Sequence, residues 1–84
     1  MIHHSDPEFW QFFDALPKRV QKLARKNFAL LKSDPRHPSL HFKRIGICWS
    51  VRIGLDYRAV EDEASDGFLW LWIGTHKEYE KFIK

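Results

Sequence analysis

The stretch WSVRIGLDYR, residues 49 to 58, predicts a two-sided β-hairpin and sets the frame for the rest of the chain. Its apolar residues, among them Val51 and Ile53, occupy every second position and therefore share one face of a strand. Arg52 points to the other face, and a glycine-containing turn brings Arg58 to the start of the next apolar run. An arginine on a sheet face is either a solvated charge or a group that binds an anion.

Two helices are predicted before this hairpin. Asp6 followed by Pro7 is typical of a helix start, and apolar residues at helical spacing follow as far as Leu16. Pro17 ends the first helix and can open a second one. The second helix has an apolar stripe with the spacing of a core-facing helix, formed by Val20, Leu23, Ala24, Asn27, Phe28 and Leu31. The two-proline segment 33–39 ends it.

From Leu40 onward the period of the pattern changes from 3.6 to 2, which indicates strands. Strands are predicted at 40–46, 47–53, 57–63 and 68–73, and residues 2–4 could add a short one. The last of these, FLWLWI, is apolar on both faces and belongs at the centre of a sheet. Thr75 is a plausible cap for a short C-terminal helix. We expect an α+β fold: an N-terminal helical hairpin packed on a twisted three- to four-stranded antiparallel sheet, with a short C-terminal helix.

Length and composition fit one domain spanning residues 1–84. Of the 84 residues, 44% are hydrophobic and 15% aromatic, which predicts a folded chain rather than a disordered one. No stretch is long and apolar enough to predict a membrane span, and the N-terminus lacks the pattern of a secretory signal. A lone Cys48 cannot form an internal disulfide and reads as a small, partly buried side chain. We expect a cytoplasmic protein without a membrane partner.

Positive charge is concentrated in one part of the chain. The formal net charge is +3 and the sequence pI is about 9.2. Between Pro35 and Leu55 there is no acidic residue, although that segment contains Arg36, Lys43, Arg44 and Arg52. This distribution predicts a cationic patch whose natural ligands are polyanions.

Several chemistries have no support in the sequence. Nucleotide-binding glycine motifs and the HExxH and CxxC metal motifs are absent, and Cys48 lies outside any nucleophile elbow. The five histidines have no regular ligand spacing. We therefore predict no cofactor and no metal site.

The candidate site residues are cationic, with two groups that transfer protons. Lys43, Arg52 and Arg58 come from adjacent predicted strands and could share a surface that clamps a phosphate. His76 and Tyr79 would face the same way on the last helix and supply proton transfer. In the alternative interpretation the arginines pair with Asp56, Glu61 or Asp62, and Tyr79 only packs the helix. Lys18, Lys22, Arg25 and Lys26 on the second helix form either a solvated face or a surface for RNA or a protein.

The order of motifs resembles the RelE/ParE superfamily of toxins from bacterial type II toxin-antitoxin systems. The resemblance rests on DPRHPSL with its following lysine, the VRIGLDYRAV hairpin and the closing WIGTHKEY. It implies a neutralising antitoxin partner, with operator DNA bound only through that antitoxin. For RelE-like members it implies endoribonuclease activity, metal-independent cleavage of mRNA on the ribosome, and hence inhibition of translation. For ParE-like members it implies inhibition of DNA gyrase, and a degenerate toxin would only bind its antitoxin.

The resemblance also suggests a role for each candidate residue. Arg52 would stabilise charge on the scissile phosphate, while Arg58 would hold the hairpin and orient the site. Lys43, and with it Arg44, would hold the RNA backbone. His76 and Tyr79 stand where RelE-like sequences carry proton-transfer groups. The basic stripe of the second helix would contact ribosomal RNA.

Overall fold

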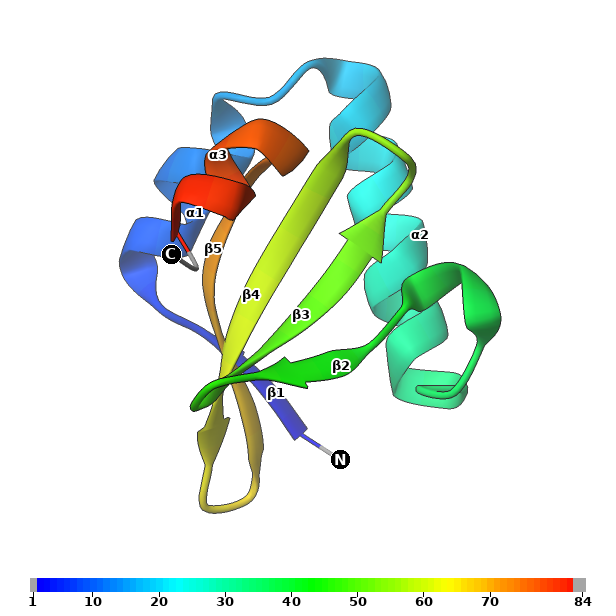
Figure 1. Ribbon diagram of the computed structural model, residues 1–84, viewed down its shortest axis with the longest axis vertical. Helices are drawn as coiled ribbons and strands as arrows, with labels where there is room; N and C mark the ends of the chain where they lie inside the picture. Colours follow the sequence, from blue (N-terminus) through cyan, green and yellow to red (C-terminus); the bar gives the residue numbers. More distant parts are fainter. Residues whose placement is uncertain (1, 83–84) are drawn as a thin grey trace.

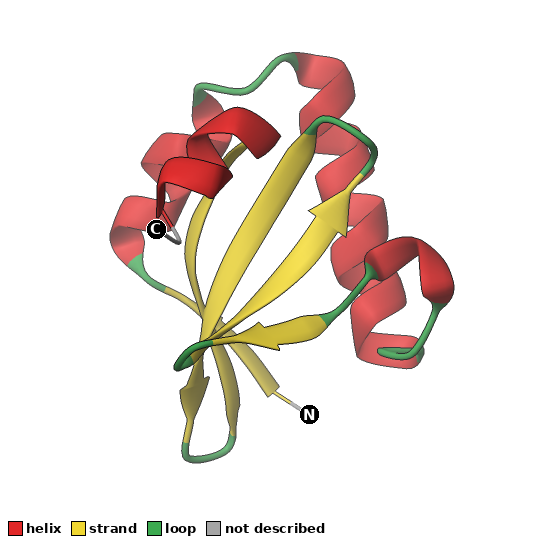
Figure 2. Cartoon of the chain, in the orientation of Figure 1, coloured by secondary structure: helices red, strands yellow, loops and turns green. Residues whose placement is uncertain are grey.

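The computed structural model describes residues 2–82, in which helices pack on a curved sheet (Figure 1). Coloured by secondary structure, the strands form one continuous layer (Figure 2). No helix within the described range is long and apolar enough to cross a membrane. The elements follow the order β1 (Ile2–Ser5), α1 (Pro7–Asp14), α2 (Lys18–Ser33), the 3-10 helix η1 (Pro38–Leu40), β2 (Lys43–Ile45), β3 (Cys48–Ile53), β4 (Tyr57–Ala64), β5 (Gly67–Thr75) and α3 (His76–Phe82).

The predicted α+β class is confirmed, and the sheet has five strands in the order β1-β5-β4-β3-β2. The possible front strand is β1, so the sheet is one strand wider than expected. It pairs with β5 in parallel, with Ile2 beside Gly67, whereas the other three pairs are antiparallel. The FLWLWI strand, predicted at the centre of the sheet, is β5; it lies between β1 and β4, next to the edge strand, and the central strand is β4.

Local signals explain where the helices begin and end. The Asp6 carboxylate accepts a hydrogen bond from the backbone N–H of Glu8 at 2.9 Å, as expected of an N-cap. Pro17 precedes α2, and the loop with two prolines follows it. The strand predicted from Leu40 is wrong at its start: Leu40 ends η1, which begins at Pro38, and β2 begins only at Lys43. Proline presets the backbone for a tight helical turn, and this overrides the alternating pattern.

The core lies between one face of the sheet and helices α1 and α2; we call this face the helix face. Val51 and Ile53 on β3 are fully buried there against Ala24 and Leu31 of α2. Phe9 of α1 packs in the same cluster. The opposite face, here the open face, carries the alternate residues of β3 and β4, and α3 covers part of it (Figure 1).

A β-bulge in β5 changes which side its residues face. Val60 on β4 pairs with Trp72, but the next residue, Glu61, pairs with Trp70, so Leu71 has no partner on β4. In a regular strand, two residues two positions apart such as Trp70 and Trp72 would point the same way. With it, Trp70 is buried in the core, while Trp72 pairs with a residue of the open face.

An ionisable pair is buried on the helix face. Glu61 is fully buried, and its Oε2 lies 2.8 Å from Nδ1 of His3, whose ring stacks between Phe68 and Trp70. Burial raises the pKa of Glu61 to about 8. Burial, followed by the charge of Lys32, lowers the pKa of His3. Both shifts favour a neutral pair at pH 7, in which the protonated carboxyl donates its hydrogen bond to the imidazole.

We expect the stability of the fold to decrease between pH 7 and 8.5 because of Glu61. Its folded-state pKa exceeds the unfolded value, so its contribution is complete below pH 4.5 and is lost as the pH rises through 8. His3 acts in the opposite sense, but mainly below pH 6.5. The loss over this range is about 1 kcal/mol.

The Glu61→Gln variant keeps the shape without the titration, so its unfolding free energy should be flat over the same range. Urea denaturation at several pH values measures this, with Glu63→Gln on the same strand as a control. An unchanged pH slope in Glu61→Gln would show that Glu61 is not the source.

Candidate active site

The open face holds a cavity of about 240 Å³ between β2, β3, β4 and α3. Four of the predicted catalytic residues line it, together with one predicted to bind RNA and two that were not predicted. The lining residues are His41, Lys43, Ser50, Arg52, Arg58, His76 and Tyr79. None of them is a carboxylate, so the lining of the cavity is positively charged, which is suited to an anion.

The strand register brings the cations together. Arg52 on β3 lies opposite Arg58 on β4, and Lys43 on β2 lies opposite Ser50 on β3. Like charges on directly opposed strand positions repel each other. The predicted convergence of Lys43, Arg52 and Arg58 is therefore present, and an anion between them would relieve the repulsion.

Arg58 is held by the turn that joins β3 to β4. Its Nη1 donates to the carbonyl oxygens of Tyr57 at 2.7 Å and Gly54 at 3.3 Å. Gly54 has φ of 67°, a left-handed conformation that favours glycine. Burial, followed by the charge of Arg52, lowers the pKa of Arg58. These contacts fix the position of its guanidinium in the wall of the cavity.

Arg52 has few partners of its own. Its Nη1 lies 3.5 Å from Nε2 of His41, and its buried Nε has no hydrogen-bond partner. Among residues 2–82 no carboxylate forms an ion pair with Arg52 or Arg58. The alternative interpretation, in which Asp56, Glu61 or Asp62 neutralises them, is thus wrong for these residues. Arg52 keeps donors available for an anion.

Helix α3 positions the two proton-transfer candidates directly after β5. Thr75 and Glu78 form a reciprocal cap: the Glu78 N–H donates to Thr75 Oγ1 at 3.1 Å, and the Thr75 N–H donates to Glu78 Oε1 at 3.0 Å. These hydrogen bonds lower the pKa of Glu78. The backbone N–H of His76 donates to the carbonyl of Asp56 at 2.7 Å, which ties the helix to the β3–β4 turn.

The side chains of His76 and Tyr79 both reach the cavity. Nε2 of His76 lies 2.9 Å from the Glu80 carboxylate, and its Nδ1 is buried without a partner. The contact with the Glu80 carboxylate orients the imidazole ring. Tyr79 is buried, and its ring centre lies 6.1 Å from that of His76.

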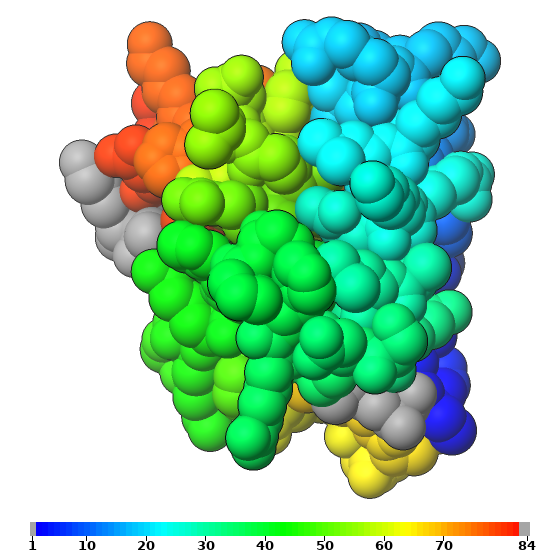
Figure 3. Space-filling view, turned by 90° about the vertical axis from the view of Figure 1, so that its right-hand side faces the viewer, coloured from blue at the N-terminus to red at the C-terminus, as the bar shows by residue number. Residues whose placement is uncertain are grey.

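The other predicted RNA-binding residues lie outside this cavity. Arg44 donates to the carbonyl of Gly46 at 3.1 Å and lies 3.7 Å from Glu63. The basic residues of α2 belong to the layer on the other side of the sheet, where Figure 3 shows α2 beside the green segment that contains η1. They are Lys18, Lys22, Arg25 and Lys26.

Sequence reasoning did not single out His41 or Ser50. His41 follows η1 with φ of 42°, a left-handed conformation that is uncommon outside glycine and asparagine. Such outliers concentrate at functional sites. The only signal in the sequence was its place in the acid-free segment. Ser50 is buried on the open face opposite Lys43 and looked like a spacer in the alternating pattern.

Residues 2–82 contain no cluster of three or more His, Cys, Asp or Glu side chains that could hold a metal ion. The donor set of the cavity, with its arginines and a lysine, fits an anionic group. The prediction of partial burial for Cys48 is correct, and burial raises the pKa of its thiol.

Comparison with protein families matches residues 18–81 to the ParE-like toxin domain. The chain belongs to the ParE-like toxin domain family. This confirms the resemblance to the RelE/ParE superfamily and makes the protein a toxin of the toxin-antitoxin type. A search of curated proteins finds no match.

Solved structures of RelE and ParE toxins share the fold of this ParE-like toxin. The RelB-RelE antitoxin-toxin complex from Methanococcus jannaschii has a TM-score of 0.74 at 13% identity, over 96% of this chain and 99% of that one. The YoeB/ParE toxin from Agrobacterium tumefaciens has a TM-score of 0.66 at 16% identity, over 90% and 99%. A mutant of E. coli RelE in the free state has a TM-score of 0.69 at 14% identity, over 96% and 88%.

The two opposed arginines of the toxin should affect stability in opposite directions. Arg52→Gln removes the repulsion and loses little, so the free energy of unfolding should rise by about 0.5 kcal/mol at low salt. Arg58→Gln loses the hydrogen bonds to the turn and should lower it by about 1 kcal/mol. Urea denaturation measures both, and added salt should reduce the gain from Arg52→Gln and increase the loss from Arg58→Gln, because each variant relieves the same screened repulsion. Equal destabilisation by both variants would contradict this view of the pair.

Proposed function

We propose that this ParE-like toxin is an endoribonuclease that cleaves mRNA on the ribosome and thereby inhibits translation. The observation that supports it is the cavity of the open face, where Lys43, Arg52 and Arg58 converge without a carboxylate. His76 and Tyr79 line the same cavity. A phosphodiester needs this combination, because cleavage builds negative charge on phosphate oxygens and moves protons on both sides of the phosphorus.

In the proposed reaction the ribose 2'-oxygen attacks the adjacent phosphorus. The bond to the 5'-oxygen of the next nucleotide breaks, which gives a 2',3'-cyclic phosphate and a free 5'-hydroxyl. Arg52 stabilises the charge on the non-bridging oxygens, since its guanidinium lines the cavity and can donate to two oxygens of a phosphate. Lys43 lies opposite Ser50 at the edge of the cavity and holds the RNA backbone.

Two protons must move in this reaction. The base takes the proton of the 2'-hydroxyl, and the acid gives a proton to the leaving 5'-oxygen. His76 is suited to the base role because its side chain lines the cavity and its ring is oriented by the Glu80 carboxylate. Tyr79 has a hydroxyl that can give the second proton. Arg58, fixed by the turn, orients the site without taking part in proton transfer.

The proposal includes a protein partner and a cellular setting. Similar folds occur in RelB-RelE complexes of archaeal origin, so we propose that an antitoxin neutralises this chain. The ribosome would supply the mRNA substrate, and both would be met in the cytoplasm. Basic residues of α2 are available for contacts with ribosomal RNA or with the antitoxin.

Inhibition of DNA gyrase is the second candidate function, because the family match is to the ParE-like domain. In that case the cationic cavity would bind a surface of the target and carry out no chemistry. The two functions predict different first effects after expression without antitoxin. Loss of translation and of intact mRNA supports the ribonuclease, whereas early DNA-damage signalling with stalled replication supports gyrase inhibition.

We expect primer extension on transcripts from cells expressing the toxin to show cuts within translated codons. Arg52→Gln should abolish the cuts and relieve growth arrest, because the phosphate loses its main charge partner. The control is Arg19→Gln, an equal change of charge at an exposed position of α2, which should still cut. Normal growth arrest by folded Arg52→Gln would contradict the role of Arg52, and growth unaffected by the folded wild type would indicate a degenerate toxin.

A further inference from the structure

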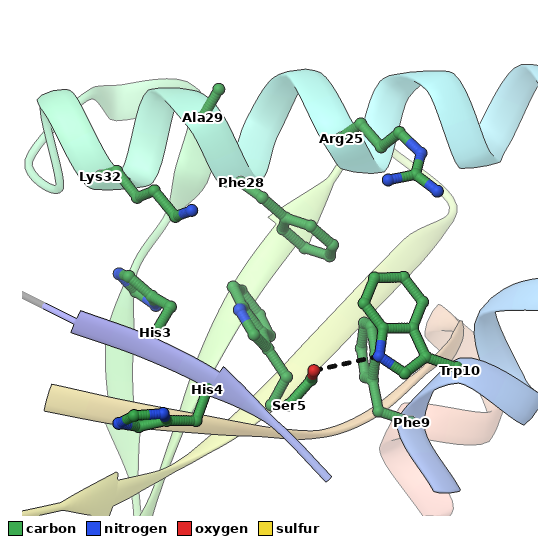
Figure 4. A pocket seen from close by; sticks show the side chains of 10 residues that line it. His3, His4, Ser5, Phe9, Trp10, Arg25, Phe28, Ala29 and Lys32 are labelled. Atoms are coloured by element: carbon green, nitrogen blue, oxygen red, sulfur yellow. Dashed lines mark hydrogen bonds between the residues drawn. The ribbon is translucent and has the colours of Figure 1, made fainter. Parts of the chain in front are cut away.

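A second pocket lies on the helix side of the sheet, away from the proposed active site. Its volume is about 320 Å³, and it is enclosed by β1, the start of α1, and α2. Figure 4 shows Arg25, Phe28 and Lys32 reaching from α2 toward Trp10 and the N-terminal strand. The remaining walls are mostly aromatic, with Phe9 and Trp70.

The walls are rigid and apolar, and the rim is positive. The indole N–H of Trp10 donates to Ser5 Oγ at 3.0 Å, which fixes the ring as a wall. The guanidinium carbon of Arg25 lies 5.8 Å from the centre of that ring. Lys32 stands at the other end of the opening, and its charge contributes to the lowered pKa of His3. No carboxylate lines this pocket.

An exposed aromatic side chain borders the pocket. Helix α1 buries Phe9 and Phe13 in the core but leaves Trp10 39% exposed. Trp10 also lines the pocket, so a ligand bound there would cover part of the exposed indole.

We propose that this pocket, lined by Trp10, Arg25, Phe28 and Lys32, is a docking site for an acidic peptide segment that inserts one aromatic or large aliphatic side chain. The inserted side chain fills the space between Phe28 and Trp10. Carboxylates that flank it meet Arg25 at one end and Lys32 at the other. The site rests on the proposed antitoxin partnership and identifies the surface of the toxin that such a segment would occupy.

The chemistry favours a peptide over RNA at this place. A nucleobase carries polar edges that need hydrogen-bond partners when buried, whereas most of the wall is hydrocarbon and the Ser5 hydroxyl already accepts from Trp10. An apolar side chain of a peptide would also cover the exposed part of Trp10, which the charged phosphates of an RNA backbone would not do. The volume fits one large side chain rather than a whole helix.

The test is direct binding of a synthetic peptide with a central phenylalanine flanked by alternating glutamate and serine, measured by fluorescence anisotropy on purified protein. Ala29→Trp fills the pocket from an exposed position of α2. Arg25→Glu combined with Lys32→Glu reverses the charge at the rim of the pocket. Each should weaken binding at least about tenfold. Arg36→Glu with Lys81→Glu, the same change of charge at exposed positions outside α2 and outside the pocket, should change it less than about twofold.

A peptide with serine in place of phenylalanine should also bind at least about tenfold more weakly. Equal binding of the two peptides, or full binding to Ala29→Trp, would overturn the proposal. So would a single-stranded RNA oligonucleotide that competes for the pocket while the acidic peptide does not bind. Failure of the proposed RNA cleavage is separable, because Arg52→Gln should leave peptide binding unchanged, and the assay contains no RNA substrate.

Discussion

The pairing register of β3 with β4 is the constraint on which the rest of the structure depends. Because side chains alternate along a strand, the register that turns Val51 and Ile53 toward the helices also turns Arg52 toward the open face. A slip of one residue would bury a guanidinium and expose two core residues. The hydrophobic core therefore enforces a repulsive arginine pair. The same strand register determines both the burial of the core and the positions of the arginines in the cavity.

We propose that each side of the sheet carries a site for an anionic ligand, and that the two sites differ in how their positive groups are arranged. On the open face the positive groups converge on a small cavity, which suits a single phosphate. On the helix side Arg25 and Lys32 stand apart on either side of aromatic walls, which suits a longer ligand of mixed character. In this proposal the cavity of the open face binds a single phosphate and the pocket of the helix side binds an acidic peptide. The hydrophobic core lies between the two sites.

Local patterns in the sequence were enough to predict most elements of the fold and the convergence of Lys43, Arg52 and Arg58. What they missed depends on contacts between distant parts of the chain. The parallel pairing of β1 with β5 joins residues more than sixty positions apart, and no short-range signal marks it. From the sequence, Glu61 was considered only as a partner for the arginines. Its actual partner, His3, lies on β1, which is distant in the sequence. His41 reaches the cavity only because its backbone takes a left-handed conformation after η1.

The bulge in β5 also bears on how this chain can change in length during evolution. Leu71 has no partner on β4, so its loss would leave the pairs Val60 with Trp72 and Glu61 with Trp70 as they are. Removal of a residue at any other place within the paired part of β5 would turn one half of the strand over. The pairing of β5 with β4 therefore has one position, Leu71, where the chain can lose a residue and still bring α3 to the same place.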